Sequence, residues 1–193
     1  MEILVFATNN KHKLDEVQQL VAETIKLKTL EEVGCFEDIP ETGHTFQANA
    51  LQKSRYIYER TQLNCFSDDS GLEIDSLNGE PGVYSARYSG SRDSEVNLQL
   101  VLEKMKGITD RKARFRCVIS LIFEEQEYFF EGAVEGSITE ERSGSAGFGY
   151  DPIFRPDGYD ITFAEMDPDE KNRISHRGKA ITKLVKFLAE KTA

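Results

Sequence analysis

Ile3-Leu4-Val5-Phe6-Ala7-Thr8-Asn9-Asn10-Lys11-His12-Lys13 is the stretch of sequence that decides the fold. Its first half is apolar and rich in strand-forming residues, so it predicts a buried strand from Ile3 to Thr8. A helix is expected directly afterwards, from Lys13 to Glu23, with one apolar face made by Leu14, Val17, Leu20 and Val21. A strand that leads at once into a helix places the chain among the α/β proteins.

The same alternation continues outward from this segment and then gives way to strands. Thr45 is a plausible N-cap for a helix to about Arg60, and Asp167-Pro168 has the N-cap and N1 proline that start a short helix. The further expected elements are strands over 25–30, 64–69, 72–75, 115–123 and 127–134, a helix over 94–105, a turn at 79–82, a glycine-rich loop at 144–149 and a last helix from Ser175 through Thr192. No repeat, linker or break in composition divides them. We therefore expect a single domain, residues 1–193, with a mixed α/β architecture and an antiparallel extension.

The composition excludes several classes of function. The net charge of −10 argues against binding of a nucleic acid polymer, which needs clusters of Lys and Arg, but leaves a single nucleotide open. No run of about 18 apolar residues exists, so no membrane span is expected. The N-terminus lacks the basic region of a signal peptide, and we expect a cytoplasmic protein.

Cysteine usage indicates neither a disulfide framework nor a zinc site. The three cysteines, Cys35, Cys65 and Cys117, are an odd number without a CxxC pair or a histidine at ligand spacing. Two of them lie in apolar, strand-like contexts, where a free cysteine acts as a small hydrophobic residue. We expect structural, free thiols.

The segment after the first strand is a candidate phosphate site. Ligands of open α/β sheets gather beyond the carboxyl ends of strands, and a helix N-terminus favours anions. Thr8 and Asn10 can donate hydrogen bonds, and Lys13 adds a point charge. The alternative is that Thr8 or Asn9 simply caps the helix while the lysines are solvated.

Adjacent carboxylates in Ser67-Asp68-Asp69-Ser70-Gly71 suggest a site for a hard divalent cation. In an extended strand Asp68 and Asp69 point to opposite faces, so both can reach one site only if the chain bends at Ser70-Gly71. A polar turn is the alternative interpretation. Glu41 is a further carboxylate ahead of a helix.

Two later segments have the chemistry of a base-binding site. In Gly147-Phe148-Gly149-Tyr150-Asp151-Pro152 the glycines allow close approach, an aromatic ring can stack on a base, and Asp151 can accept from ring nitrogens. Lys171 and Ser175-His176-Arg177 can donate to carbonyl or phosphate oxygens. Each segment alone also fits an ordinary turn or helix start.

Taken in order, these segments resemble the inosine triphosphate pyrophosphatase family. The blocks that carry the resemblance are Ala7–Asn10 with Lys13, Glu41–Gly43 with Asn49-Ala50 and Lys53, Asp68–Leu72, Gly82–Tyr88, Gly147–Phe154, and Lys171 with Ile174–Gly178. They span nearly the whole chain. One departure is visible, because Asn9 stands where many members carry glycine.

The resemblance implies a two-lobed fold with a long mixed sheet flanked by helices, a cleft between the lobes, a homodimer and a Mg²⁺ cofactor. Glu41 and Asp69 would organise the metal, with Asp69 also the proton acceptor and Asp68 its catalytic support. The substrate-binding residues it implies are Thr8, Asn9, Asn10, Lys11, His12, Lys13, Lys53, Ser70, Phe148, Gly149, Tyr150, Asp151, Lys171, His176 and Arg177.

The implied reaction is hydrolysis of ITP, dITP and XTP to the monophosphate and pyrophosphate. We expect water to attack the α-phosphorus, with the lysines offsetting charge on the departing pyrophosphate. His176 and Arg177 as donors would pair with a 6-oxo group and mispair with the 6-amino group of adenine. A related pyrophosphatase with pyrimidine preference and a non-catalytic nucleotide sensor are the alternatives.

Overall fold

The computed structural model describes residues 2–21 and 25–191, which divide into two compact units. The first unit comprises residues 1–69, 117–132 and 177–193, and the second comprises 70–116 and 133–176. The expected ends of two helices, Glu23 and Thr192, lie outside the described residues. The expectation of a single domain stays a prediction.

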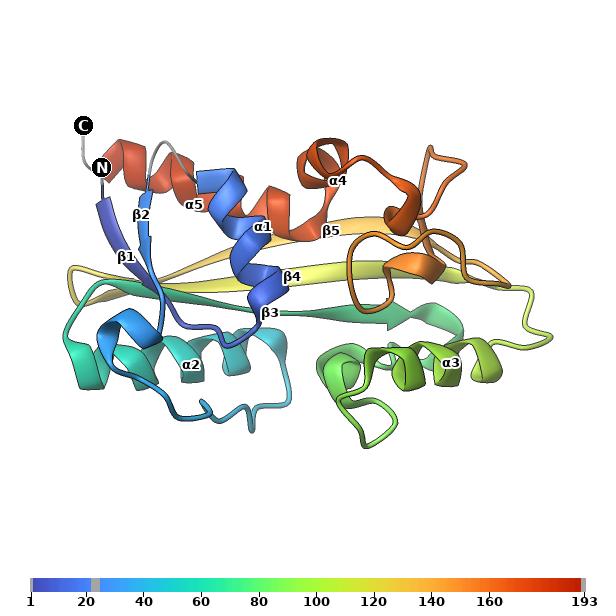
Figure 1. The fold of residues 1–193 in the computed structure, drawn as a ribbon, viewed down its shortest axis with the longest axis horizontal. Coiled ribbons are helices and arrows are strands. Elements are labelled where there is room, and N and C mark those ends of the chain that lie inside the picture. Colours follow the sequence, from blue (N-terminus) through green and yellow to red (C-terminus); the bar gives the residue numbers. More distant parts are fainter. Residues whose placement is uncertain (1, 22–24, 192–193) are drawn as a thin grey trace. The chain divides into compact units, whose positions relative to one another are not determined.

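Strands and helices follow one another much as the sequence predicts (Figure 1). The strands are β1 (Glu2–Phe6), β2 (Ile25–Lys28), β3 (Cys65–Ile74), β4 (Lys112–Phe123), β5 (Gln126–Ile138) and β6 (Phe154–Pro156). The α-helices are α1 (Lys11–Val21), α2 (Phe46–Thr61), α3 (Ser94–Lys104), α4 (Pro168–Ile174) and α5 (His176–Lys191). Short 3₁₀ helices are η1 (Glu31–Val33), η2 (Asp75–Leu77), η3 (Gly82–Arg87), η4 (Asp151–Ile153) and η5 (Phe163–Glu165).

The strands form a six-stranded mixed sheet in the order β2-β1-β3-β4-β5-β6. The pairs β1–β2 and β1–β3 are parallel, and β5–β6 is antiparallel. β4 and β5 form the expected hairpin, joined by Glu124 and Glu125, which both have positive φ as a tight hairpin turn requires. The fold is therefore an α/β fold with an antiparallel extension, as the sequence predicts.

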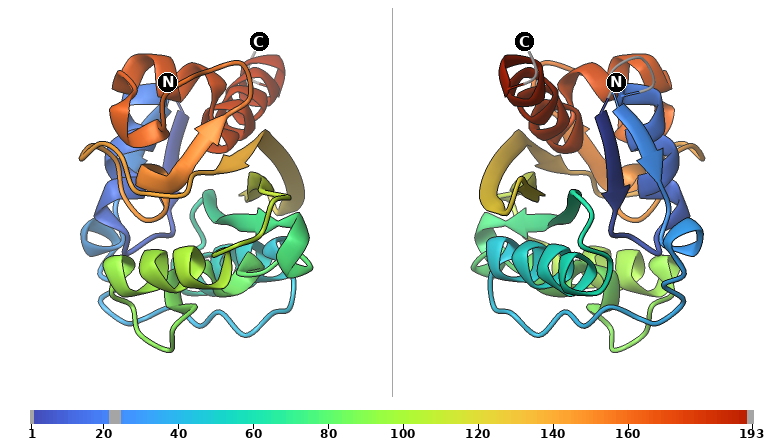
Figure 2. Two further views of the ribbon diagram at one scale, coloured as in Figure 1. Left: turned by 90° about the vertical axis from the view of Figure 1, so that its right-hand side faces the viewer. Right: turned by 90° about the vertical axis from the view of Figure 1, so that its left-hand side faces the viewer.

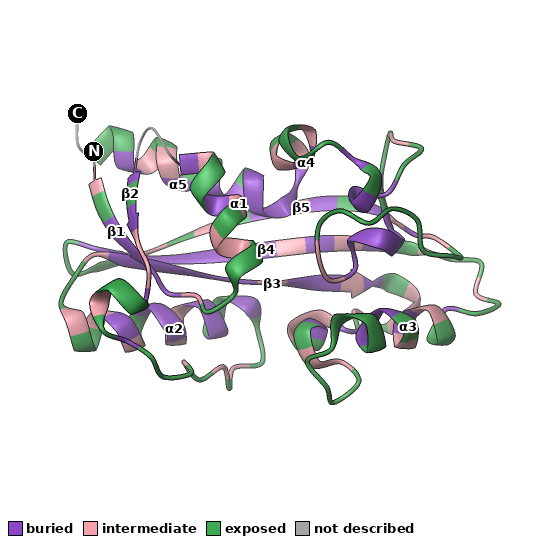
Figure 3. Ribbon diagram, in the orientation of Figure 1, coloured by how far each residue is buried: buried purple, intermediate pink, exposed green. Residues whose placement is uncertain are grey.

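In the first unit, helices cover both faces of the strands. Successive residues of a strand point to opposite faces, and β1 shows this directly, because Phe6 packs with the cluster that includes α1 and α5 whereas Val5 packs with Ile57 of α2. Figures 1 and 2 show α1 and α5 on one side of β1 and β2, with α2 on the other. Figure 3 shows that these strands are largely buried and that exposed residues lie on the outer sides of the helices.

Capping residues fix where the helices of the site begin. Thr45 accepts a hydrogen bond from Ala48 N at 3.0 Å, which confirms the predicted start of α2. Asp167 caps α4 in the same way, with Pro168 at the first helical position. At α1 the cap differs from both sequence alternatives, because Asn10 Oδ1 accepts from Lys13 N at 3.2 Å and the helix begins at Lys11.

β3 corrects the sequence analysis. We expected two strands, over 64–69 and 72–75, and a bend at Ser70-Gly71 was the condition for Asp68 and Asp69 to reach one site, but β3 runs without a break from Cys65 to Ile74. Asp68 and Asp69 therefore keep the opposite directions of an extended chain.

The second unit has a separate core around the aromatic residues of β4 and the segments that follow β5. Phe115, Phe154 and Phe163 pack with ring centroids 4.6 to 5.9 Å apart. η5 holds the loop that begins at Ser143, because Thr162 Oγ1 donates to Ser143 O at 2.7 Å. This contact fixes the start of the glycine-rich loop.

Two further findings concern the helices and the cysteines of the described part of the chain. No helix within residues 2–21 or 25–191 is long and apolar enough to cross a membrane. Cys35, Cys65 and Cys117 are all free and buried, as predicted. Burial raises the pKa of Cys65 to about 12, which suits a structural thiol.

Candidate active site

The loop between β1 and α1 places polar groups beyond the carboxyl end of a buried parallel strand. Thr8 Oγ1 accepts from Asn10 N at 3.1 Å, so these side chains shape the loop itself. Asn9, Lys11 and His12 are exposed at the start of α1, and Thr8 is half-buried. Asn9 does not have a positive φ, so the side chain that replaces the usual glycine causes no left-handed strain.

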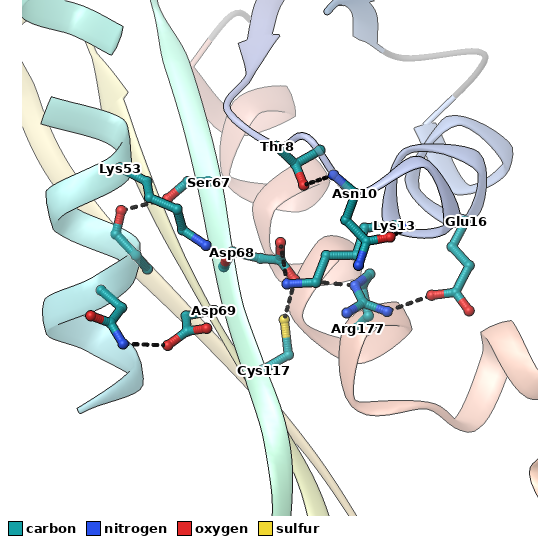
Figure 4. A network of polar contacts seen from close by, with 12 residues as sticks. Thr8, Asn10, Lys13, Glu16, Lys53, Ser67, Asp68, Asp69, Cys117 and Arg177 are labelled. Atoms are coloured by element: carbon teal, nitrogen blue, oxygen red, sulfur yellow. Dashed lines mark hydrogen bonds and ion pairs between the residues drawn. The ribbon is translucent and has the colours of Figure 1, made fainter. Parts of the chain in front are cut away.

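Asp68 lies on the face of β3 that also carries α1 and α5. Its Oδ1 accepts from Lys13 Nζ at 3.2 Å, and its Oδ2 accepts from Arg177 Nε at 3.2 Å (Figure 4). Cys117 Sγ lies 3.8 Å from the same Oδ2. Burial would raise the pKa of Asp68, but the two cations outweigh it and hold the pKa well below the ordinary 3.8. Asp68 is thus ionised at neutral pH, and the cations of Lys13 and Arg177 balance its charge.

Arg177 joins Asp68 to a second carboxylate. Its Nη1 donates to Glu16 of α1, and the guanidinium is only 3% exposed. Burial would lower the pKa of Arg177, but the negative charges of Asp68 and Glu16 outweigh this effect and raise it above its ordinary value. Glu16, Arg177, Asp68 and Lys13 form a chain of alternating charge that connects α1, α5 and β3. Arg177 was predicted to donate to the base, and its ion pairs with Asp68 and Glu16 were not predicted.

Asp69 points to the opposite face of β3, toward α2 (Figure 4). Its Oδ2 accepts from Asn49 Nδ2 at 3.0 Å. Burial raises the pKa of Asp69, and the negative charge of Glu41 raises it further, although Lys53 and Lys13 oppose this. The two neighbouring aspartates therefore differ in chemistry, because one is neutralised by cations and the other is held by a neutral amide.

Lys53 of α2 lies on the same side as Asp69. Its Nζ donates to Glu41 Oε1 at 2.6 Å and to the main-chain O of Asp68 at 2.6 Å. Burial would lower the pKa of Lys53, but Glu41 and Asp68 raise it above 10.5. A fully ionised lysine therefore lies between the segment of Glu41 and the middle of β3.

Small residues let α2 come close enough to the sheet to present these groups. Ser67 Oγ donates to Ala50 O, and the hydroxyls of Ser54 and Ser120 lie 2.8 Å apart. Asn49 and Lys53 are one helical turn apart, so both side chains project from the face that these contacts press against β3. Asn49 and Lys53 are both buried on this inner face of α2.

The described residues fit a cation held jointly with a substrate. No group of three or more His, Cys, Asp or Glu residues poised for a metal occurs within 2–21 and 25–191. Mg²⁺ is usually held by only one or two carboxylates, with substrate phosphates and waters completing its shell. Glu41 and Asp69 supply two carboxylates. Burial and, to a lesser extent, the negative charge of Glu41 raise the pKa of Asp69, and a bound cation would offset both effects.

In the second unit, the predicted base-binding residues gather around a buried ion pair. Lys171 Nζ donates to Asp151 Oδ2 at 2.8 Å, and the same oxygen accepts from Phe148 N at 3.1 Å. Lys171 Nζ also lies 5.5 Å from the ring centroid of Phe148, within the range of a cation–π contact. Asp151 was expected to accept a hydrogen bond from a base. In the structure its Oδ2 accepts from Lys171.

Gly147 is required by this pair. It has φ +73°, and a Cβ there would lie 2.1 Å from Asp151 Oδ2.

Other contacts place the remaining predicted residues of the second unit. Tyr150 Oη donates to Ser85 O at 2.6 Å, which fixes the residue between Gly149 and Asp151. The ring of His176 stacks on Phe115 at 4.8 Å and 13°. Ser70 is half-buried in β3.

The predicted site residues thus fall into two groups. Those in the first unit lie on two faces of β3, with Thr8, Asn10, Lys13, Asp68 and Arg177 on the side of α1 and α5, and Glu41, Lys53 and Asp69 on the side of α2. Those in the second unit are Phe148, Gly149, Tyr150, Asp151, Lys171 and His176. Glu16, Asn49 and Cys117 contact site residues and were missed. Asn49 had a signal in the sequence, because a polar residue one turn before Lys53 on the inner face of a helix needs a buried partner.

Comparison with known proteins gives consistent matches along nearly the full chain. A model of the Ham1 family matches residues 4–187. A dITP/XTP pyrophosphatase of Flavobacterium johnsoniae is 47% identical over 186 residues, 96% of this chain and 97% of the relative. The protein of the same name from Porphyromonas gingivalis is 48% identical over 190 residues, 97% and 98% of the two chains. A solved HAM1 protein from Coxiella burnetii is 43% identical with a TM-score of 0.90, covering 98% and 100%.

Proposed function

The chain belongs to the Ham1 family, and from this premise we propose that it hydrolyses dITP, ITP and XTP to the nucleoside monophosphate and pyrophosphate. The observation that carries the proposal is the arrangement on the α2 face of β3. Asp69 and Glu41 share this face with the buried cation of Lys53. Carboxylates that bind a metal and a lysine that binds phosphate are the parts that hydrolysis of a phosphoanhydride needs.

The triphosphate would be held by the β1–α1 loop and by lysines. The N-terminus of α1 favours an anion, and Thr8 and Asn10 supply donors beside it. Lys13 adds its charge one turn into the helix. Because Arg177 also neutralises Asp68, Lys13 can turn toward a phosphate without leaving that carboxylate unpaired. Lys53 offsets the charge on the departing pyrophosphate.

Mg²⁺ is part of this proposal. Glu41 and Asp69 would hold it, and it would supply charge neutralisation at the phosphate oxygens and a lowered pKa for water. The chain's own contribution is to hold Glu41 and Asp69 on the α2 side of β3 and to keep Lys53 ionised beside them.

Asp69 is the residue we assign to proton acceptance. Its raised pKa makes it a better base than an ordinary aspartate, and the amide of Asn49 donates to its Oδ2. Asp68 cannot take this role, because Lys13 and Arg177 keep its pKa low. Asp68 would instead support catalysis by fixing Lys13 and the middle of β3.

Base selection is assigned to the second unit, with Phe148 stacking and Lys171 and His176 donating. Donors suit the 6-oxo group of hypoxanthine and xanthine and mispair with the amino group of adenine. The two bonds that Arg177 makes to carboxylates give it a structural task as well, and its contact with the base stays a prediction. A homodimer and a cytoplasmic location belong to the same proposal.

A product analysis tests the proposal. The purified protein is incubated with Mg²⁺ and, separately, ITP, dITP, XTP, ATP, GTP and dTTP, and products are identified by chromatography. We expect monophosphate and pyrophosphate from ITP, dITP and XTP, at rates well above those for ATP and dTTP. Diphosphate with phosphate, a preference for dTTP, or no turnover would refute the proposal.

A further inference from the structure

Asn49 links the two segments that carry the carboxylates. Its side chain is fully buried. Its Oδ1 accepts from Gly43 N at 2.7 Å, and its Nδ2 donates to Asp69 Oδ2 at 3.0 Å. Gly43 lies two residues after Glu41, so one amide group connects the Glu41 segment to Asp69.

The orientation of this amide is fixed by its neighbours. Gly43 N is a donor and requires an acceptor, so Oδ1 must face it. The Nδ2 group then faces Asp69 and can only donate. A Cβ at Gly43 would lie 2.8 Å from both Asn49 Oδ1 and Ala48 Cβ, so the approach of the two segments also depends on glycine.

Lys53 makes a parallel link one turn later along α2. It joins Glu41 to the main-chain O of Asp68, just as Asn49 joins Gly43 to Asp69. Two links at a spacing of four residues define both the separation and the relative rotation of the Glu41 segment and β3, which a single link would leave free to pivot.

We propose that Asn49 is the positioning residue of the metal-binding carboxylates, and that it sets the direction of the Asp69 carboxylate and the place of Glu41 together. This inference rests on the proposed function, because it assigns Asn49 a task in that reaction. Asn49 contacts neither the phosphates nor the reacting water in this role. Hydrogen-bond partners of metal ligands typically contribute about 10- to 100-fold to affinity or activity.

The variant Asn49→Asp distinguishes two roles of Asn49, namely directing the Asp69 carboxylate and holding the Gly43 segment. The two side chains have the same shape, and a carboxylate oxygen can still accept from Gly43 N. What is lost is the donor to Asp69, which is replaced by an acceptor. If Asn49 only held the Gly43 segment, this variant would remain active.

Gln52 offers a matched control. It lies on the same helix, and its Oε1 accepts from Thr42 N at 2.8 Å, so Gln52→Ala also removes a link between α2 and the Glu41 segment. Gln52 has no contact with Asp69 among the interactions described. A general loosening of this segment would affect Gln52→Ala and Asn49→Ala alike.

The experiment measures kcat, KM for ITP, thermal unfolding and Mn²⁺ affinity for the wild type and the three variants. Mn²⁺ binding is followed by electron paramagnetic resonance with the non-hydrolysable α,β-imido analogue of ITP present. We expect kcat to fall about 10- to 100-fold in Asn49→Ala and Asn49→Asp, with KM for ITP within about threefold of the wild type because the base and phosphate contacts remain. The Kd for Mn²⁺ should rise about tenfold in Asn49→Ala. Gln52→Ala should match the wild type in kcat and Mn²⁺ affinity.

The outcomes separate this inference from the proposed function. If the wild type and Gln52→Ala cleave ITP and Asn49→Asp does so equally well, the positioning role is wrong and the proposed function stands. Equal losses in Gln52→Ala and Asn49→Ala would also overturn it, in favour of loop support. A wild type that does not cleave ITP overturns the proposed function and this inference with it.

Discussion

Asp68 and Asp69 are neighbours in β3, yet their carboxylates lie in opposite environments. Asp68 is bound by Lys13 and Arg177, each at 3.2 Å, and its pKa is lowered. Asp69 is held by the amide of Asn49 and its pKa is raised. The continuous strand separates the two acids, and the proposed division of labour follows from it, with Asp68 supporting the structure and Asp69 reacting.

Asp69→Asn should abolish turnover and spare the fold. We expect kcat to fall by about 10²- to 10⁴-fold, the usual contribution of a positioned base. The amide oxygen can still accept from Asn49, and loss of a carboxylate whose pKa is raised removes an unfavourable charge. Thermal unfolding of the metal-free variant should therefore occur at the wild-type temperature or above. Unchanged kcat would refute the role of Asp69.

Asp68→Asn should destabilise the protein. It leaves the half-buried Lys13 and the buried Arg177 without their shared carboxylate, and breaking such a pair costs about 3 to 5 kcal/mol. Because the pKa of Asp68 is lowered on folding, its stabilisation is complete above the unfolded-state pKa and is lost as the pH falls toward the folded-state value. The difference in unfolding free energy between the wild type and the variant should therefore be largest near pH 7 and shrink below pH 3.8. Urea unfolding at several pH values measures this, and a difference that grows on acidification would contradict it.

Arg177→Ala should lower both stability and base selectivity. The variant leaves Asp68 and Glu16 without their common partner, which predicts a loss of about 3 to 5 kcal/mol. If Arg177 also reads the base, the ratio of kcat/KM for ITP to that for ATP should narrow. Glu16→Gln is the companion variant, because it keeps the Arg177–Asp68 pair. An unaltered ratio in a folded Arg177→Ala protein would remove this residue from base reading.

Glu165→Ala should weaken nucleotide binding through the loop that carries Phe148. Glu165 accepts from Thr162 N at 2.8 Å and from the hydroxyl of Ser143, and so anchors the start of that loop. We expect KM for ITP to rise about tenfold, which corresponds to about 1.4 kcal/mol, with kcat little changed. The exposed Glu140, in the same connection, provides the control Glu140→Ala. Equal KM values for both variants would show that the anchor is irrelevant to binding.

Local signals in the sequence predicted much of the fold. Thr45 and Asp167 are caps that act on amides two or three residues away, and the strand-forming apolar residues from Phe115 to Phe123 favour a strand by their own propensity. Such features depend on neighbours in sequence, so they can be read without the fold.

The rest depends on contacts between distant residues. Nothing near Ser70-Gly71 distinguishes a bend from a continuous strand, because the pairing of β3 with its neighbours decides it. Arg177 and Asp68 are 109 residues apart, so no local pattern in the sequence could predict the ion pair between them. The motifs indicated candidate site residues, and the contacts between these residues are the basis on which we propose different roles for Asp68 and Asp69.

An isotope experiment tests most directly whether water attacks the α-phosphorus. Excess enzyme, Mg²⁺ and ITP are mixed in H₂¹⁸O for a single turnover, and the products are analysed by mass spectrometry. We predict one ¹⁸O atom in IMP and none in pyrophosphate. Label in pyrophosphate would place the attack on the β-phosphorus, and unlabelled IMP would indicate an enzyme oxygen as nucleophile, so either result would contradict the proposed chemistry.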